Sequence, residues 1–277
     1  MLLWAERDAF SLYIWPVKKH TLTAFVGFAI LFVLYHAAEY MILFKNSAVG
    51  FLAFQALFFV AAYGIAKWQR QAGLAAWGLD GSTPFFKHLL LGVIMGSLLY
   101  GTTLGISLFV GVEEITTVPA FMDMLAPLGL FIFGSFFSSL SEDVLTRGYV
   151  FHHLKGKTDV RWIIFISAAI YVLNHIYRLD DGLVTWLYLF LLGVLFVIPL
   201  LLTGRLWFTG GLHWAGNVTF YFTHEIIRTE ETNAQVSANA VFIIVILFFI
   251  PLNYYLLKWA GLIKRQEKPA GHALAVN

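Results

Sequence analysis

The chain has 277 residues, of which 60% are hydrophobic and 12% are charged, and its formal net charge is +2. Soluble domains contain about 45–50% apolar and about 25% charged residues, so this chain has too few charges to cover its apolar surface in water. The composition therefore excludes an ordinary soluble protein. The small net charge argues against a nucleic-acid partner. Because the chain has no cysteine, it has no disulfide, no thiolate metal site and no cysteine nucleophile.

The first 20 residues combine aromatic and charged side chains, with Trp4 among the former and Lys18 and Lys19 near the end. This mixture is typical of a segment that lies in the membrane interface. Pro16 is expected to interrupt a helix here, because proline lacks the amide hydrogen and clashes with the preceding turn. The sequence therefore predicts an interfacial N-terminal segment over residues 1–20.

Beyond this segment the chain contains eight stretches that are long and apolar enough to suggest spanning helices, which need about 20 residues each. Their expected bounds are Thr21–Phe44, Val49–Trp68, His88–Val112, Ala126–His153, Val160–Ile176, Leu183–Leu202, Leu206–Thr223 and Val236–Trp259. No repeat or linker separates them, so the sequence predicts one all-α, polytopic transmembrane bundle of about eight helices over residues 21–264. The polar tail, residues 265–277, is predicted to be disordered.

The basic residues are distributed unevenly between the two sides of this predicted bundle. If both termini face the cytoplasm, all but three of the 18 Lys and Arg residues fall on the cytoplasmic side, and the exceptions are Lys45, Arg178 and Arg228. Such a bias is typical of membrane proteins, whose cytoplasmic loops are rich in Lys and Arg. We therefore expect a multi-pass protein with both termini in the cytoplasm, and the inner membrane of a bacterium is its expected location.

The end of the fourth predicted span carries two acids and a base, Glu142, Asp143 and Arg147. A charged residue at the centre of a span costs at least about 2.5–3.5 kcal/mol, so it needs a partner or a function. Asp143 and Arg147 are four residues apart and can pair along one helix face, whereas Glu142 points about 100° away and has no local cation. The acids could lie in a cytoplasmic helix end, but the apolar residues that follow them favour a position inside the membrane.

Two later spans each place a pair of side chains on one helix face. Tyr171 and His175 are four residues apart, and so are His213 and Asn217, whose spacing aims both side chains at one point. By helical rise His213 lies only about 12 Å from the cytoplasmic end of its span, so this span is expected either to tilt or to begin with non-helical backbone, which Gly210 and Gly211 would supply. Neither pair by itself indicates whether its residues have a structural or a catalytic role.

The first predicted span also carries ionisable residues. His36 and Glu39 are three residues apart, so they lie on one face of the helix. We expect this pair to face the bundle and to contact another polar residue, with a structural role rather than a catalytic one.

In their order along the chain, the three later motifs resemble the CPBP family of intramembrane proteases, which includes the type II CAAX prenyl proteases and relatives linked to bacteriocin immunity. The family pattern is Glu-Glu-x3-Arg, then Phe-x3-His, then His-x3-Asn or His-x3-Asp, and the resemblance covers roughly residues 70–223. This chain departs from the pattern twice, with Asp143 in place of the second Glu and Tyr171 in place of Phe. Asp143 shortens the reach of its carboxylate by one methylene, while the first Glu of the motif, Glu142, is present.

The resemblance implies an intramembrane endopeptidase that acts on a membrane-associated peptide or protein. The residues that it assigns to the active site are Glu142, Asp143, Arg147, His175, His213 and Asn217. Glu142, helped by His175, would activate the attacking water. His213 and Asn217 would stabilise the oxyanion, and Asp143 with Arg147 would fix the helix and polarise the site.

A second mechanism uses some of the same residues. Glu142, His175 and His213 form a His2Glu set, which is a ligand type of catalytic zinc sites. The chain has no H-E-x-x-H helix that would hold two ligands together. We therefore favour glutamic chemistry without a cofactor, and a zinc-dependent mechanism remains open.

Two other functions remain open from the sequence. A non-catalytic member of the same family would bind a peptide or a partner protein in the polar cavity, as a bacteriocin-immunity or scaffolding protein. A proton-coupled transporter would use the buried ionisable residues as a relay, although the chain shows no repeat symmetry of the kind found in transporters. The motifs do not predict the substrate, whether it is prenylated, or the oligomeric state.

Overall fold

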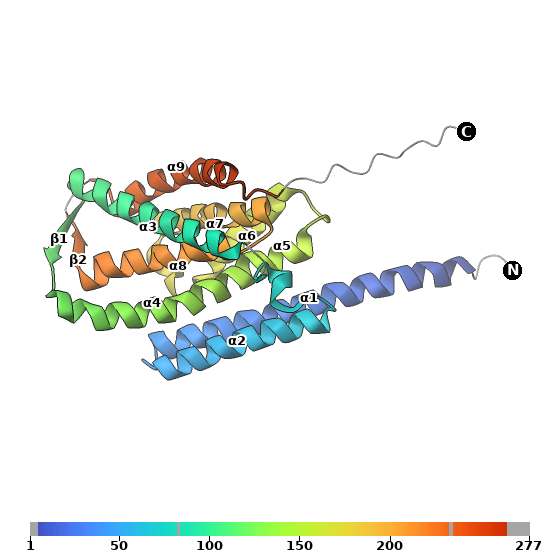
Figure 1. Cartoon of the computed structure of the whole chain (residues 1–277). Coiled ribbons are helices and arrows are strands. Elements are labelled where there is room, and N and C mark those ends of the chain that lie inside the picture. Colours follow the sequence, from blue (N-terminus) through green and yellow to red (C-terminus); the bar gives the residue numbers. More distant parts are fainter. Residues whose placement is uncertain (1–4, 82–83, 233–234, 265–277) are drawn as a thin grey trace, which may run out of the picture.

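The computed structural model describes residues 5–81, 84–232 and 235–264. Over these residues it is a helical bundle with one small two-stranded sheet (Figure 1). Six helices are long and apolar enough to cross a membrane. In chain order they are α1 (Ala5–Leu43), α2 (Ala48–Trp68), α3 (Phe85–Phe109), α4 (Phe121–Asp143) with its continuation, α7 (Leu183–Thr203) and α9 (Ala238–Trp259).

Two shorter helices complete the predicted set of eight, which is confirmed. They are α6 (Val160–Asn174) and α8 (Trp207–Tyr221), each of 15 residues, and α8 continues into a π-helical turn, η4 (Phe222–Ile226). At about 1.5 Å per residue each is about 22 Å long, which is less than the roughly 30 Å of a bilayer core. The histidine motifs therefore lie on or directly after the two shortest α-helices of this set of eight.

The helical backbone continues beyond the two acids at the end of α4. It continues through a π-helical turn, η2 (Val144–Gly148), into α5 (Tyr149–Leu154). All five residues of η2 are buried. π-Helical turns are uncommon and recur at functional sites, and this one directly follows Glu142 and Asp143.

Helix α1 is continuous from Ala5 to Leu43, so the expected break at Pro16 is wrong. A proline inside a helix removes one backbone hydrogen bond, and a helix of 39 residues retains the others on both sides of it. The position of residues 1–20 at the membrane interface stays a prediction. The predicted disordered tail, residues 265–277, lies outside the described residues.

Glycines set a close contact between α3 and α8. Gly210 and Gly211 lie inside α8, so non-helical backbone at these glycines is wrong, and the alternative, a tilt of this span, stays a prediction. A Cβ atom on Gly211 would lie 2.4 Å from the carbonyl oxygen of Leu89, and one on Gly96 of α3 would lie 2.2 Å from that of Leu212. Small residues let membrane helices approach closely, and here they bring α8 into backbone contact with α3.

The two strands mark one end of the bundle. β1 (Glu113–Thr117) follows α3 and pairs antiparallel with β2 (Arg228–Glu231), which precedes α9. Figure 1 shows this sheet at one end of the bundle, with α5 and the start of α1 toward the other. We call these the sheet end and the basic end, because the second carries most of the cationic side chains. These include Lys67, Lys87, Lys155, Arg161, Arg205 and Lys258.

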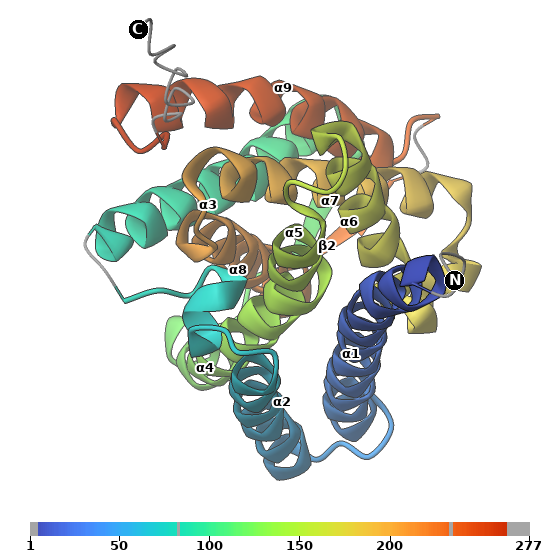
Figure 2. The ribbon, with the colours of Figure 1, turned by 90° about the vertical axis from the view of Figure 1, so that its right-hand side faces the viewer.

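The remaining helices are arranged on two sides of the bundle. Figure 2 shows the α1–α2 hairpin on one side and α9 on the opposite side, beside α3 and α7. One apolar core joins α3, α7, α8 and α9 through residues such as Leu192 and Ile246, and a second joins α1 and α2 to η2 through Leu31 and Leu145. A single 3-10 turn, η1 (Gly73–Trp77), follows α2 and packs into the second core.

Candidate active site

The second acid of α4 pairs with the arginine that follows it by four residues, as predicted. Nη1 of Arg147 donates a hydrogen bond to Oδ1 of Asp143, and both side chains are fully buried. The guanidinium carbon lies 4.6 Å from the ring centre of Tyr171 and 4.7 Å from that of Phe196. The two aromatic rings stabilise the cation further, and removing either charged partner would leave the other uncompensated, at a cost of about 3–5 kcal/mol.

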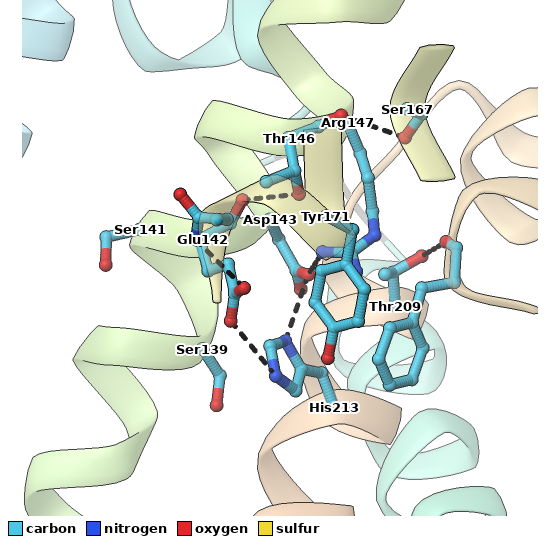
Figure 3. Close-up of polar contacts among 12 residues, drawn as sticks. Ser139, Ser141, Glu142, Asp143, Thr146, Arg147, Ser167, Tyr171, Thr209 and His213 are labelled. Atoms are coloured by element: carbon cyan, nitrogen blue, oxygen red, sulfur yellow. Dashed lines mark hydrogen bonds and ion pairs between the residues drawn. The ribbon is translucent and has the colours of Figure 1, made fainter. Parts of the chain in front are cut away.

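His213 reaches this ion pair from α8. Its Nδ1 is 3.1 Å from Oδ1 of Asp143, and its Nε2 is 3.5 Å from Oε2 of Glu142 (Figure 3). A carboxylate only accepts hydrogen bonds, so Nδ1 donates in the contact with Asp143, and this contact directs Nε2 toward the second carboxylate, Glu142. Asp143 therefore orients the imidazole of His213 in addition to pairing with Arg147.

Glu142 lies where α4, α6 and α8 meet, and its side chain is 7% exposed. Its Oε1 accepts a hydrogen bond from Nδ2 of Asn174 at 3.0 Å and lies 4.0 Å from Nδ1 of His175. Three helices thus bring His175 and His213 within hydrogen-bond or one-water reach of Glu142, as the spacing of the motifs predicts. Their chemical roles stay predictions.

His175 directly follows α6 and precedes a 3-10 turn, η3 (Ile176–Asp181), and its ring is held by its own helix. Nδ1 is 2.8 Å from the carbonyl oxygen of Tyr171. A carbonyl oxygen only accepts, so Nδ1 carries the proton of the neutral imidazole and Nε2 is the basic nitrogen. The four-residue spacing of Tyr171 and His175 therefore selects the tautomer of the histidine.

Two polar contacts, one helical turn apart, join α4 and α8. Nδ2 of Asn217 donates to Oγ of Ser139 at 3.1 Å, beside the contact of His213 with Asp143. Asn217 and His213 thus each contact a partner at its own level on α4, and their joint action at one point of the site stays a prediction. A carboxamide has two N–H donors, so Asn217 keeps one for a ligand.

A cavity of about 210 Å³ reaches this cluster, and its lining includes Tyr171, His175 and Asn217. The rest of the wall comes from α3, α7, α8, α9, β1, η3 and η4. Glu142 does not line the cavity but lies next to His175, which does. The volume is large enough for several waters or for a short piece of extended chain.

The pair on α1 faces the bundle and contacts a polar residue, as predicted. Nε2 of His36 is 3.0 Å from the carbonyl oxygen of Asn174 and 3.7 Å from Oε2 of Glu39. Sequence analysis does not identify Asn174, although an amide directly before His175 at the end of an apolar helix is a usable signal. It also misses Ser139, one helical turn before Asp143.

The described residues contain no group of three or more His, Asp or Glu side chains arranged to hold a metal ion. In the set of Glu142, His175 and His213, Nδ1 of each imidazole already faces an acceptor, so only Nε2 of each could be a ligand. An imidazole that ligates zinc commonly donates its other N–H to an acceptor of this kind, so the contacts of Nδ1 are compatible with the zinc alternative. We derive no step through a metal, and a chelation experiment tests that alternative.

A comparison with protein-family models matches residues 124–219 to the type II CAAX prenyl endopeptidase Rce1-like family. All six residues that the motifs assign to the site lie within this segment. The resemblance to the CPBP family is thus confirmed for this segment, which matches the Rce1-like domain, and the chain is a multi-pass membrane protein. Comparisons with curated proteins and with solved structures found no match.

Proposed function

We propose that this chain is an intramembrane endopeptidase that hydrolyses a peptide bond of a membrane-associated peptide or protein. The observation that carries the proposal is the position of Glu142, a buried carboxylate between histidines from two other helices and next to a cavity wall. Oε2 lies 3.5 Å from Nε2 of His213, and Oε1 lies 4.0 Å from Nδ1 of His175. Catalytic contacts of this length shorten when a substrate closes the site.

In the proposed reaction Glu142 is the general base. It takes a proton from a water molecule while the water oxygen forms a bond to the scissile carbonyl carbon. Nε2 of His175, the ring nitrogen not held by its own helix, accepts a hydrogen bond from the same water and orients it. Glu142 later returns the proton to the nitrogen of the leaving segment, so that one water is consumed and one carboxyl and one amine are formed.

The developing oxyanion would be stabilised by His213 and Asn217. Asn217 offers the N–H that Ser139 does not use. His213 would donate from Nε2, while the buried carboxylate of Asp143 holds the ring through Nδ1. Two donors of this kind are the usual number for an oxyanion hole.

Glu142→Gln tests the proposal, because the amide keeps the size of the side chain but cannot accept the proton. The purified full chain is incubated in detergent with a panel of membrane-anchored peptides, and the products are mapped by mass spectrometry. We expect Glu142→Gln to bind but not cleave, while Glu39→Gln, a change at another acid in the membrane, continues to cleave. Cleavage by Glu142→Gln at the wild-type rate would refute the proposed base, and peptide binding without cleavage by the wild type would favour the non-catalytic alternative.

The same preparation tests the metal alternative. Glutamic chemistry predicts that strong chelators leave cleavage unchanged. Stoichiometric zinc in the purified chain, with activity lost on chelation and restored by zinc, would assign Glu142, His175 and His213 as ligands instead. The loss of cleavage in Glu142→Gln would then reflect the loss of a zinc ligand rather than the loss of a proton acceptor.

A further inference from the structure

The two short helices of the site begin at the same end of the bundle. α6 begins after Asp159 and α8 begins after Leu206, both next to the arginines of the basic end. Each α-helix is about 22 Å long against a bilayer core of roughly 30 Å, and toward the sheet end α6 is followed by the 3-10 turn η3 and α8 by the π-helical turn η4. Irregular backbone at this depth is tolerated where it lines a water-filled cavity.

The cavity lies where these helices stop. Asn217 is four residues, or about 6 Å, from the last residue of α8, and ten residues, or about 15 Å, from the first. The wall continues from His175 and Asn217 toward Arg178 in η3, Glu113 in β1 and His224 in η4. The side chain of Arg178 is 53% exposed, so the cavity reaches the molecular surface at the sheet end.

The opposite side of the site is closed. All five residues of η2, which continue α4 from Asp143 toward the basic end, are buried. Leu145, Leu200 and Leu206 on that side are at most 1% exposed. A chain that approaches from the basic end would therefore meet packed apolar side chains before it reached Glu142.

The charges identify the two ends. The basic end carries most of the Lys and Arg residues, whereas the sheet end holds the three exceptions together with acids such as Glu114, Glu230 and Glu231. Loops rich in Lys and Arg remain in the cytoplasm. By this criterion the sheet end, and the mouth of the cavity, lie on the non-cytoplasmic side.

The ionisable groups around the mouth are already paired within the chain. Nε2 of His224 is 3.0 Å from Oε1 of Glu113, and Nε of Arg178 donates to Oδ2 of Asp181 at 2.9 Å. A charged ligand side chain would have to break one of these pairs, whereas the Tyr100, Tyr188 and Phe242 rings of the wall can pack against an uncharged one. The lining thus suits an extended, uncharged stretch of peptide.

We propose that this cavity is the route by which the scissile segment reaches the site, and that the substrate is an extended, uncharged peptide segment displayed on the non-cytoplasmic side of the membrane. This inference rests on the proposed peptidase function. It requires a substrate on the side of the membrane opposite to the basic end.

The absence of cysteine from the chain makes a direct test possible, because any single introduced cysteine is the only thiol. The variants are Ala238→Cys at the mouth, Thr103→Cys on the wall, and Ala260→Cys at the other end of α9 as the matched control. A membrane-impermeant maleimide is added to intact spheroplasts that express the full chain. We expect Ala238→Cys and Thr103→Cys to be labelled, and Ala260→Cys to be labelled only after permeabilisation.

Each other pattern overturns the inference. Labelling of Ala238→Cys without Thr103→Cys would mean that the cavity does not open at the sheet end. Labelling of Ala260→Cys without the other two in intact spheroplasts would mean that the sheet end faces the cytoplasm. Labelling does not depend on catalysis, so failure of the proposed function and failure of the proposed route give different results.

A second arm tests the substrate. A peptide sequence that the purified chain cleaves is fused to one membrane-spanning helix, once on the non-cytoplasmic side and once on the cytoplasmic side, and expressed with the chain in the same cells. We expect cleavage of the first fusion only, and loss of that cleavage after the maleimide has modified Thr103→Cys. Cleavage of the cytoplasmic fusion alone, or unchanged cleavage after modification of Thr103→Cys, would refute the route.

Discussion

Nδ2 of Asn174 donates a hydrogen bond to Oε1 of Glu142 at 3.0 Å, and the backbone carbonyl of the same asparagine is 3.0 Å from Nε2 of His36. One residue of α6 therefore connects α1 to the candidate base on α4. Since a carboxylate between two histidines has several rotamers open to it, the amide of Asn174 selects the one that faces His213. We infer that Asn174 is a positioning residue.

Asn174→Ala should lower kcat while leaving KM nearly unchanged, because the substrate does not touch this side chain in the proposed mechanism. A hydrogen bond to a charged group contributes about 1.5–3 kcal/mol, so the expected loss is roughly 10- to 100-fold. Asn253→Ala is the matched control, since Asn253 is also a buried asparagine of an apolar helix, but its side chain has no hydrogen-bond partner among the described residues. A loss of kcat equal in both variants would indicate a general effect of removing a buried amide.

The sequence predicts most of the fold because the lipid environment imposes a simple pattern. Apolar stretches of about 20 residues identify the spans, and the i, i+4 spacing identifies the pairing of Asp143 with Arg147. The predictions that were wrong concern the local backbone, at Pro16 and at Gly210–Gly211. A glycine pair is compatible both with an irregular segment and with close helix packing, and only the position of α3 against Gly211 distinguishes the two.

The spacing of residues within a motif also does not predict which residues of two helices contact each other. The sequence places His213 and Asn217 on one face of α8, but which residues of α4 they meet depends on the offset between the two helices. That offset places Ser139 opposite Asn217 and Asp143 opposite His213. Asn174 is missed for the same reason, since its partner lies on another helix.

Asn217→Ala should reduce kcat by about 10²–10³-fold, which is typical for the loss of one oxyanion-hole donor. Ser139→Ala should cost less, because the hydroxyl of Ser139 only accepts from Asn217 and holds it in place. Steady-state cleavage of the same peptide by the two variants and the double variant gives the coupling between them. Equal losses in all three variants would show that the two residues act as one unit, whereas a larger loss for Ser139→Ala would contradict the assigned order.

Gly96→Ala should destabilise the bundle. Its Cβ would lie 2.2 Å from the carbonyl oxygen of Leu212, so α3 and α8 would have to separate, and overpacking of this kind costs about 1–3 kcal/mol or more. Gly101→Ala on the same helix is the control, because nothing lies within 4 Å of its added Cβ and alanine favours the helix by roughly 0.5–1 kcal/mol. Thermal unfolding in detergent should show a lower Tm for the first variant and an equal or higher Tm for the second; equal Tm values would contradict the close contact.

The pairing of Glu113 with His224 should make stability at the sheet end depend on pH. Burial alone would raise the pKa of Glu113, but the hydrogen bond and the charge of His224 outweigh it and lower that pKa below its usual value. A carboxyl whose folded-state pKa is lowered contributes stability above its unfolded-state pKa and loses it as pH falls through the folded-state value.

Glu113→Gln should therefore be less stable than the wild type above about pH 5, and the difference should shrink as pH falls below the usual glutamate pKa of about 4.3 and through the lowered folded-state value. Glu114→Gln is the control, because the side chain of Glu114 is exposed on the same strand and its replacement should leave the pH profile unchanged. Thermal unfolding of the three proteins across this pH range measures the effect. A stability difference between wild type and Glu113→Gln that stayed constant down to pH 3 would mean that the carboxylate of Glu113 does not stabilise the junction of β1 with η4.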